Sequence, residues 1–179
     1  MDTLPSVTQV LSPFADFSGV RPEVLDNAAR RGRQVHAICS AIVQGLWVPE
    51  IPEDCAGYVE SFRRWLPVVE KVIFCEKRLA DEALGFKGKP DLGVVIKGDK
   101  MISIPDLKTP AVKSPLWKAQ LAAYKHLVEH NGYGPVGRVF SLRLKKDGGR
   151  PILDEYFGSP QDFAAFLSAL NAYRCFKAA

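Results

Sequence analysis

Two short stretches that each contain an aspartate, on either side of a predicted turn, constrain the fold of this chain more than any other feature. One, Gly-Lys-Pro-Asp, ends at Asp91, and the other, Ile-Pro-Asp-Leu-Lys, contains Asp106. Gly98-Asp99 lies between them and is typical of a two-residue hairpin turn. If the hairpin closes without a bulge, the two aspartates lie directly opposite each other, with Cβ atoms about 4.5–5.5 Å apart. Pro105 cannot donate a ladder hydrogen bond, so a bulge there would shift this register by one residue.

The chemistry that such a hairpin could carry is divalent-metal chemistry. Lys108 leaves the strand on the same face as Asp106, two residues earlier. Mg²⁺ prefers hard oxygen ligands, and one or two carboxylates with waters and substrate phosphates suffice to hold it. Asp91 and Asp106 would supply the carboxylates and the Leu107 carbonyl a third oxygen, while Lys108 would orient a water or stabilise charge on a phosphoryl group. The alternative is an exposed polar strand end, because an Asp-x-Lys triplet alone is common.

The length and composition indicate an ordinary globular protein. A chain of 179 residues is long enough for one domain with its own core, and we expect a single domain over 1–179. No apolar run approaches the ~20 residues of a membrane span, and the N-terminal segment has no basic-then-apolar signal pattern. We therefore expect a cytoplasmic protein without a membrane partner.

The cysteines and the net charge exclude few functional classes of protein. No Cys-x-x-Cys pair occurs, which argues against a zinc ribbon and gives no local support for an iron–sulfur cluster. The four cysteines are Cys39, Cys55, Cys75 and Cys175, and we expect them to be reduced structural thiols. The net charge of +4 is compatible with a polyanionic partner, although many basic proteins bind no nucleic acid.

Hydrophobic periodicity predicts two helices, a three-stranded antiparallel meander, a crossover helix, two more strands and a last helix. At most a short helix near 6–11 precedes them. The predicted helices are 21–46 or 22–46, 56–65, 115–130 and 160–176. The predicted strands are 68–79, 92–96, 101–104, 136–144 and 151–157. The first two strands would be joined by 82–88. This order predicts an α/β fold, with a central mixed β-sheet flanked by helices.

Two further residues could complete a metal site. On the predicted strand 68–79, Glu76 would neighbour the Asp91 strand; the alternative is a solvated acid. His36 lies one helical turn after Gly32, and a glycine inside a helix often marks the close approach of another group. A phosphate or metal near His36 would explain why a glycine, which has no side chain, occupies position 32. A half-buried histidine beside a tight helix contact is at least as consistent with the spacing.

The predicted crossover helix carries two pairs of residues at a spacing of four. Gln120 lies on an otherwise apolar stripe, so it needs a hydrogen-bond partner if buried. It could reach a DNA phosphate or hold a catalytic side chain, with Tyr124 beside it, although core packing explains Tyr124 equally well. His126 and His130 have metal-ligand spacing. Since the sequence implies no third ligand near them, we expect ordinary helix surface.

Basic residues form three clusters that could bind a phosphate backbone without reading bases, in a salt-dependent manner. A solvated face is the alternative for each cluster. The clusters are Arg30, Arg31 and Arg33; Arg63 and Arg64; and Arg138, Arg143, Lys145, Lys146 and Arg150.

Taken in order, these motifs resemble the PD-(D/E)XK nucleases, and most closely the RecB-like branch with its phage exonucleases. The resemblance covers about 5–125, and the Pro-Ser-Val-Thr opening at 5–8 is also similar to phage members. The matching motifs are Arg31-Gly32-x-x-Val35-His36, Glu76, Gly88-x-x-Asp91, Asp106-Leu107-Lys108-Thr109 and Gln120-x-x-x-Tyr124.

The resemblance implies a restriction-endonuclease-like core with Mg²⁺ or Mn²⁺ at the site. It assigns Asp91 and Asp106 as metal ligands and Lys108 as the catalytic lysine. Glu76 and His36 would be auxiliary ligands or positioning residues. Gln120 and Tyr124 would support the site, and together with Arg31 and Arg33 they are the residues that we expect to contact DNA.

The expected activity is metal-dependent hydrolysis of DNA phosphodiester bonds, by an exonuclease of phage, prophage or recombination-repair type. A structure-selective endonuclease is one alternative. A DNA-binding module without catalysis is another, although the intact Asp91, Asp106 and Lys108 argue against it. The expected partner is DNA, with a recombinase, an annealing protein or a helicase as further candidates, and a homo-oligomer stays open.

Overall fold

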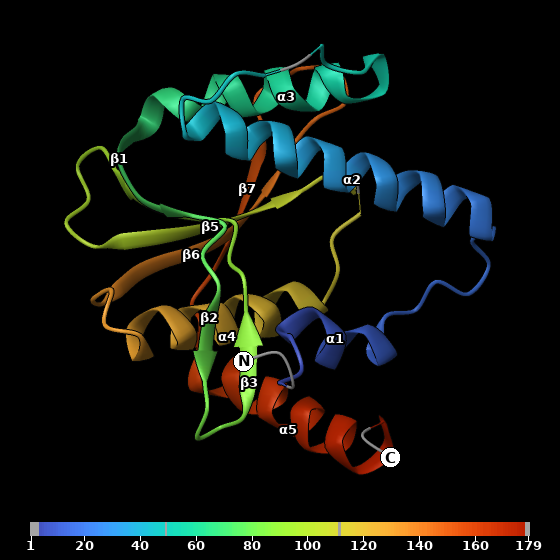
Figure 1. The fold of residues 1–179 in the computed structure, drawn as a ribbon, viewed down its shortest axis with the longest axis vertical. Coiled ribbons are helices and arrows are strands. Elements are labelled where there is room, and N and C mark those ends of the chain that lie inside the picture. Colours follow the sequence, from blue (N-terminus) through green and yellow to red (C-terminus); the bar gives the residue numbers. More distant parts are fainter. Residues whose placement is uncertain (1–3, 49, 111, 178–179) are drawn as a thin grey trace.

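A computed structural model describes residues 4–48, 50–110 and 112–177 of the chain (Figure 1). Five strands form a central sheet in the order β1-β4-β5-β6-β7, and β2 and β3 form a separate two-stranded sheet. The strands are β1 Val69–Cys75, β2 Leu79–Asp81, β3 Phe86–Gly88, β4 Leu92–Ile96, β5 Ile102–Lys108, β6 Val136–Arg143 and β7 Ile152–Tyr156. The α-helices are α1 Val7–Leu11, α2 Pro22–Val43, α3 Glu53–Trp65, α4 Leu116–His130 and α5 Pro160–Lys177.

The central sheet is mixed, as the element order predicted. Strand β5 pairs with β6 in parallel, and the other neighbours in the sheet pair antiparallel. Parallel neighbours cannot be joined by a tight turn, and α4 supplies the crossover between β5 and β6. The predicted α/β class with a helix-flanked mixed sheet is therefore confirmed. No helix within the described residues is long and apolar enough to cross a membrane.

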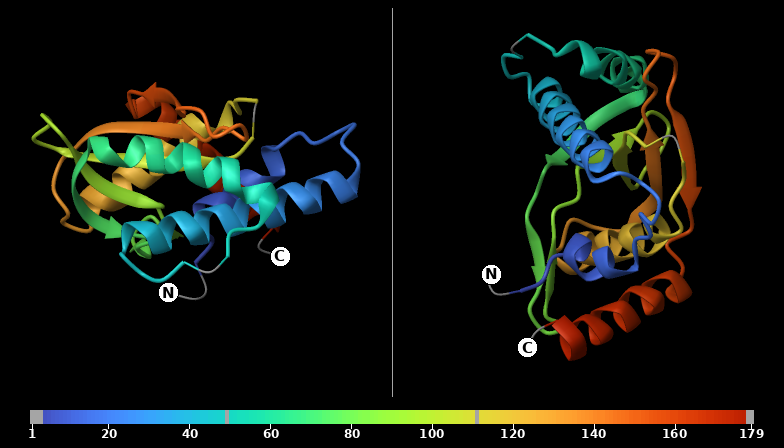
Figure 2. Two further views of the ribbon diagram at one scale, coloured as in Figure 1. Left: turned by 90° about the horizontal axis from the view of Figure 1, so that it is seen from above. Right: turned by 90° about the vertical axis from the view of Figure 1, so that its right-hand side faces the viewer.

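Helices cover both faces of the sheet (Figures 1 and 2). Helices α2 and α3 pack on one face, and α1, α4 and α5 pack on the other. On β5, Ile104 belongs to the core on the α4 side, whereas Leu107 belongs to the core under α2 and α3. Because side chains alternate along a strand, Asp106 and Lys108 lie on the α4 side. This alternation decides which helix can reach the two charged side chains.

The hairpin between β4 and β5 has the predicted register but a different turn. Val94 pairs with Ser103, as expected for closure around 98–99. The Asp99 amide, however, donates to the Ile96 carbonyl at 2.9 Å, which makes Lys97 and Gly98 the central residues. Gly98 has a φ of 88°, a conformation that favours glycine. Asp91 lies just before β4, next to the ladder instead of inside it.

Pro105 does not disturb the pairing of β5 with β6. The parallel register runs evenly from Ser103 to Lys108, with Pro105 opposite Phe140. The ladder from β5 to β4 is assigned at Val94–Ser103, so Pro105 lies beyond the antiparallel pairing. A missing N–H is tolerated at such a position.

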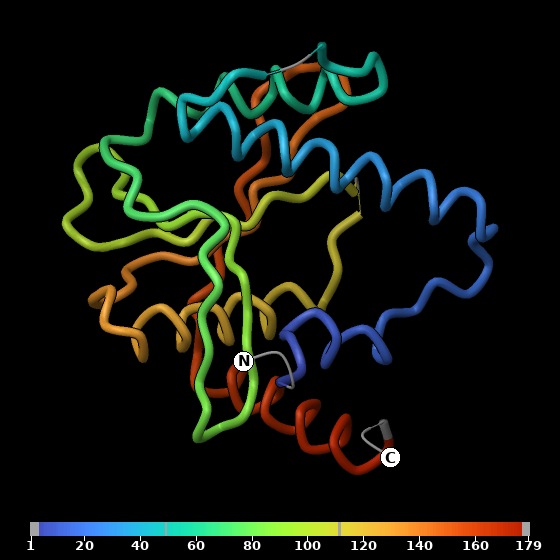
Figure 3. Tube along the Cα trace, viewed as in Figure 1, coloured from blue at the N-terminus to red at the C-terminus, as the bar shows by residue number. Residues whose placement is uncertain are grey.

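The prediction is wrong between the first two strands of the central sheet. The strand predicted over 68–79 ends earlier, and the connection predicted over 82–88 contains a strand. Strand β1 ends at Cys75, and Leu79–Asp81 forms a hairpin with Phe86–Gly88. Glu76 has a φ of 51°, which is incompatible with a continuous strand. The hairpin leaves the central sheet and packs against α4 (Figure 3).

Three element boundaries also differ from the predicted ones, each for a local reason. Helix α2 ends at Val43 instead of 46, because Gly45 with a φ of 66° closes the helix through a bond from the Leu46 amide to the Ala41 carbonyl. Helix α3 begins at Glu53 directly after Pro52, earlier than predicted. Strand β5 continues past Ile104 to Lys108.

The cysteine prediction agrees with the structure. All four cysteines are free thiols, and Cys39 and Cys55 are buried. Both belong to the core that α2 and α3 share with the sheet.

Candidate active site

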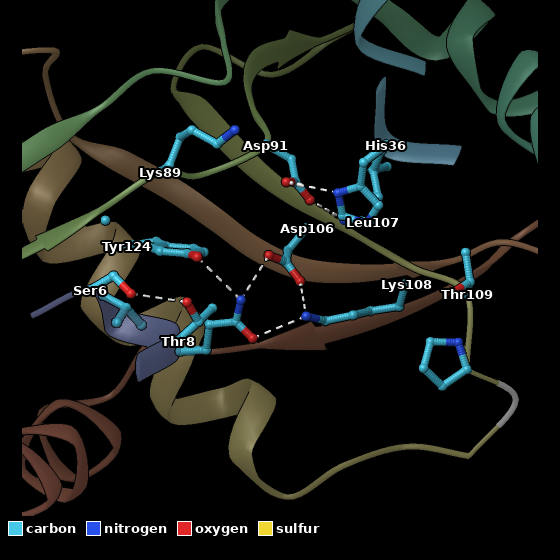
Figure 4. Close-up of a pocket in the computed structure, with 14 residues that line it drawn as sticks. Ser6, Thr8, His36, Lys89, Asp91, Asp106, Leu107, Lys108, Thr109 and Tyr124 are labelled. Carbon is cyan, nitrogen blue, oxygen red and sulfur yellow. Dashed lines mark hydrogen bonds and ion pairs between the residues drawn. The ribbon is translucent and has the colours of Figure 1, made fainter. Parts of the chain in front are cut away.

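A cavity of about 350 Å³ lies where β5, α1, α2, α4 and the segment after β3 meet. It brings together residues that are far apart in the sequence (Figure 4). Its lining consists of Ser6, Val7, Thr8, His36, Gly88, Lys89, Asp91, Asp106, Leu107, Lys108, Thr109, Pro110, Gln120 and Tyr124. Seven of the ten residues assigned to this site from the sequence line the cavity. Glu76 lies beside it and contacts Lys89 and Asp91, and Arg31 and Arg33 are treated below.

The Asp91 carboxylate is fixed from two sides. One oxygen lies 3.1 Å from Nδ1 of His36, and the other accepts a hydrogen bond of 2.8 Å from the Leu107 amide. Burial by itself would raise the pKa of Asp91, but the charge and hydrogen bond of His36 and the bond from Leu107 outweigh it and lower the pKa. For His36, burial alone would lower the pKa, but the Asp91 carboxylate raises it to about 9. The pair is therefore charged near neutral pH.

Asp106 and Lys108 form a second charged pair on the α4 side. Lys108 Nζ lies 2.5 Å from Asp106 Oδ2, and in Figure 4 the two side chains point toward each other. The carboxyl group of Asp106 is deeply buried. Burial is the main cause that raises its pKa, and although Lys108 opposes this effect, the Asp91 carboxylate adds to it.

Gln120 connects this pair to α4. Its Oε1 accepts a hydrogen bond of 3.0 Å from Lys108, and its Nε2 donates to Asp106 Oδ1 at 3.2 Å and to the Tyr124 hydroxyl at 3.3 Å. The expectation that a buried glutamine on an apolar stripe needs partners is thus met. Gln120 and Tyr124 are both buried, and burial raises the pKa of the Tyr124 hydroxyl, so Tyr124 stays protonated.

Glu76 reaches the site by a route that the sequence did not predict. It lies after β1 in the left-handed region, with a φ of 51°, a conformation that costs a non-glycine residue about 1–3 kcal/mol. Its amide donates to the Asp91 carbonyl at 2.8 Å, and its carboxylate pairs with Lys89. Strained backbone of this kind often accompanies a functional site.

The donor atoms near Asp91 fit a divalent cation. His36, Glu76 and Asp91 offer ligand atoms that all lie within 4.8 Å of one another. Asp106 is outside this group, and its oxygens contact Lys108 and Gln120. The Leu107 amide donates to Asp91, and coordination of the ion by the Leu107 carbonyl stays a prediction. The two carboxylates are ligands that suit Mg²⁺ or Mn²⁺, and the imidazole could add a third donor atom.

The predicted basic clusters are only partly free to meet a phosphate backbone. Arg31 lies 5.7 Å above the ring of Tyr58, and Arg33 is exposed; within the described residues, the lining of the cavity includes neither. Arg138 pairs with Glu155 and Asp99, and Arg143 pairs with Asp154. Sequence reasoning did not foresee these acidic partners.

Three basic residues of the third cluster, Arg143, Lys145 and Lys146, lie close to the site. They line a second groove together with Thr109 and Pro110, which also line the cavity. A basic surface therefore adjoins the site directly.

Some cavity residues were missed from the sequence. Ser6 caps α1 in a capping box with Gln9, and the Ser-x-x-Gln spacing could have indicated that the chain folds back here. Lys89 carries the charge that faces Glu76, and a lysine in a Gly-Lys-Pro-Asp stretch gives no signal for that contact. Gly32 lies near the site, since a Cβ there would be 3.6 Å from Thr109 Oγ1.

The expectation for the second histidine pair is wrong. A third candidate ligand does lie beside His126 and His130, because Asp81 of β2 contacts both. The sequence could not suggest it, since the hairpin that carries Asp81 was predicted as a connection.

Comparison with known proteins assigns the family. The family model of the PD-(D/E)XK nuclease superfamily matches residues 20–175, while no curated protein matches the chain. Members of this superfamily cleave phosphodiester bonds of DNA and typically use divalent metals, and the carboxylates and histidine around Asp91 suit such an ion. By the extent of this match, the chain belongs to the PD-(D/E)XK nuclease superfamily.

Proposed function

We propose that this chain is a deoxyribonuclease that uses Mg²⁺ or Mn²⁺ and degrades DNA from an end. The observation that carries the proposal is the placement of Asp91, Asp106 and Lys108 around one open cavity, with the lysine ammonium 2.5 Å from Asp106. The exonuclease assignment, and a phage, prophage or recombination-repair role, depend on the similarity of the motif order to RecB-like and phage members. Residues 1–179 would form one domain; a cytoplasmic location and the protein partners stay predictions.

Asp91, Asp106 and Glu76 would hold the cation, with His36 as an auxiliary ligand. The supporting observation is that the ligand atoms of His36, Glu76 and Asp91 lie within 4.8 Å of one another. Asp106, which is buried, lines the same cavity. Bound there, the cation would supply Lewis acidity, which makes water nucleophilic at neutral pH and neutralises charge on a phosphoryl group.

Lys108 would act on the scissile phosphate. Its ammonium is held by Asp106 and Gln120 and lies 5.3 Å above the ring of Trp117. These contacts fix a positive charge before substrate arrives, and such preorganised charge stabilises the negative charge that develops during phosphoryl transfer. Lys108 can also orient the attacking water by donating a hydrogen bond to it.

Gln120 and Tyr124 would be positioning residues. Gln120 touches both members of the Asp106–Lys108 pair and is itself bonded to the Tyr124 hydroxyl. Since catalytic groups must be held closely in place, we infer that these two residues keep the carboxylate and the ammonium in register. Contact of Arg31 and Arg33 with DNA stays a prediction.

The test compares end-labelled linear DNA with closed-circular DNA, in Mg²⁺, Mn²⁺ or EDTA. We expect loss of the linear DNA alone, only with metal, and no cleavage by the Asp106→Asn variant. Asp154→Asn is the matched control, because Asp154 pairs with Arg143 outside the cavity; it should cleave normally. Cleavage of circles would replace the proposed exonuclease with the endonuclease alternative. No cleavage of either DNA, with DNA binding retained, would favour a non-catalytic binding module.

A further inference from the structure

A second group of potential metal ligands lies where the β2–β3 hairpin packs against α4. Oδ2 of Asp81 is 2.8 Å from Nε2 of His126 and 3.6 Å from Nδ1 of His130. All three ligand atoms lie within 4.8 Å of one another. Within the described residues, none of the three belongs to the lining of the cavity around Asp91.

The imidazoles are held in orientations that suit a shared ligand. His126 and His130 are one turn apart on α4, and their rings stack at 5.6 Å with an interplanar angle of 17°. The His126 ring also stacks on Phe163 of α5, at 4.5 Å and 18°. Packing on α5 therefore holds the first ring, and helical spacing brings the second ring beside it.

Asp81 is oriented by its own hairpin. Its side chain is 3% exposed, and its Oδ1 accepts a hydrogen bond of 2.8 Å from the Leu84 amide. The bond to Leu84 leaves Oδ2 directed at the histidines. Support of a ligating carboxylate by a second hydrogen bond is a regular feature of metal sites in proteins.

The observed separations are close to those of a tetrahedral ion. Zinc bonds of about 2.0–2.2 Å to nitrogen and oxygen place neighbouring ligand atoms about 3.3–3.6 Å apart. Of the two separations from Asp81 Oδ2, the one to His130, 3.6 Å, falls in that range, and the one to His126, 2.8 Å, is about 0.5 Å shorter. Small side-chain adjustments would suffice, with no movement of the helix or the hairpin.

The donor set selects the kind of ion. Two imidazoles with one carboxylate suit Zn²⁺, whereas Mg²⁺ prefers oxygen ligands alone. The His130 side chain is 46% exposed, which leaves space for a water as the fourth ligand and a path for the ion to enter.

We propose that Asp81, His126 and His130 bind Zn²⁺ at a site separate from the nuclease cavity, and that the ion fastens the β2–β3 hairpin to α4. This link matters for the cavity, because β3 leads through Gly88 directly to Asp91. Asn131 already ties the same elements together, donating to the Ala80 carbonyl at 3.0 Å.

The test measures Zn²⁺ binding in an Asp91→Asn background, which weakens the carboxylate site and separates this proposal from the proposed nuclease activity. We expect one Zn²⁺ per chain after dialysis, measured by elemental analysis. At Zn²⁺ concentrations of about 100 times the Kd, the Tm should rise by about 5–10 °C. Co²⁺ in place of Zn²⁺ should give the intense visible absorption of a tetrahedral site.

Adding His130→Gln should abolish bound zinc, the rise in Tm and the Co²⁺ band. His130 is half exposed, so this variant should keep the metal-free Tm of its parent. The matched control is His36→Gln, which removes the histidine of the other cluster and should retain all three signals. Absence of stoichiometric zinc in the Asp91→Asn protein, or equal binding with and without His130, would overturn the proposal and leave Asp81–His126 as a plain hydrogen-bonded pair.

Discussion

Two clusters of residues, each with candidate metal ligands, differ in how they are built. The cavity cluster consists of His36, Glu76, Asp91, Asp106 and Lys108, and the hairpin cluster consists of Asp81, His126 and His130. The cavity cluster takes its residues from separate segments and adjoins an open space of about 350 Å³. The hairpin cluster joins a single strand to a single helix.

The two clusters also differ in the partner of their buried aspartate. Asp81 and Asp106 have nearly equal side-chain exposure, 3% and 4%. Asp106 faces the amino group of Lys108, which suits contact with a phosphate, whereas Asp81 faces imidazoles, which are ligands for borderline metals. Burial of an acid therefore does not identify its function; the charge of its partner does.

The largest expected effect separates the clusters by activity. Lys108→Ala should lower the single-turnover rate of DNA cleavage about 10³-fold, because it removes the preorganised charge beside Asp106. DNA binding in a gel shift should change little, and zinc binding at the hairpin cluster should not change. Lys118→Ala is the control, since Lys118 is an exposed lysine of α4 that pairs with Asp162. An unchanged cleavage rate in Lys108→Ala would remove the assignment of the cavity cluster.

An intermediate effect is expected at Gly88, which lies on the hairpin between the clusters. A Cβ at Gly88 would lie 2.7 Å from Leu127 Cδ1 and 3.0 Å from the Tyr124 ring. Gly88→Ala should therefore lower the free energy of unfolding in urea by about 1–3 kcal/mol.

Gly32→Ala is the matched control for Gly88→Ala. A Cβ at Gly32 would make only an ordinary contact of 3.6 Å with Thr109 Oγ1. Alanine also stabilises a helix by about 1 kcal/mol relative to glycine. Its stability should stay equal or rise. If Gly88→Ala is as stable as the parent, the hairpin is not tightly packed on α4, and the link between the clusters fails.

The smallest effect is expected at the edge of the cavity cluster. Tyr124→Phe removes the hydroxyl that accepts a bond from Gln120 at 3.3 Å, while the ring keeps its packing. Cleavage should slow by a few-fold, and the free energy of unfolding should fall by about 1 kcal/mol or less. Tyr156→Phe serves as a control, because the Tyr156 hydroxyl has no hydrogen-bond partner in the described part of the chain. A larger loss in Tyr124→Phe would make the hydroxyl part of the catalytic machinery.

Predictions from the sequence succeeded where the signal was local. Pro160 begins α5, as the Ser-Pro pair predicted, whereas Pro115 is the N-cap of α4, which begins one residue later than predicted. The register of Val94 with Ser103 followed from alternation and a nearby turn. The i, i+4 spacing of Gln120 and Tyr124 was enough to expect that they act together.

Predictions failed where a contact joins distant segments. Glu76 was expected on a strand face, but its backbone is held in the left-handed region beside Asp91. Asp81 and His126 are 45 residues apart, and no sequence pattern in either segment predicts contact with the other. The acids that pair with Arg138 and Arg143 come from β7 and from the turn before β5.

The sequence by itself determined the order of the elements outside the β2–β3 hairpin, the mixed sheet, and the placement of Asp106 and Lys108 on one face of a strand. These features depend on periodicity and on turn and cap residues, which act over a few positions. Only the tertiary structure decided that Gln120 holds Lys108, that Glu76 meets Asp91 and that Asp81 joins the two histidines. The physical reason is that spacing within an element fixes the face on which a side chain lies, whereas the packing of layers decides what that face meets.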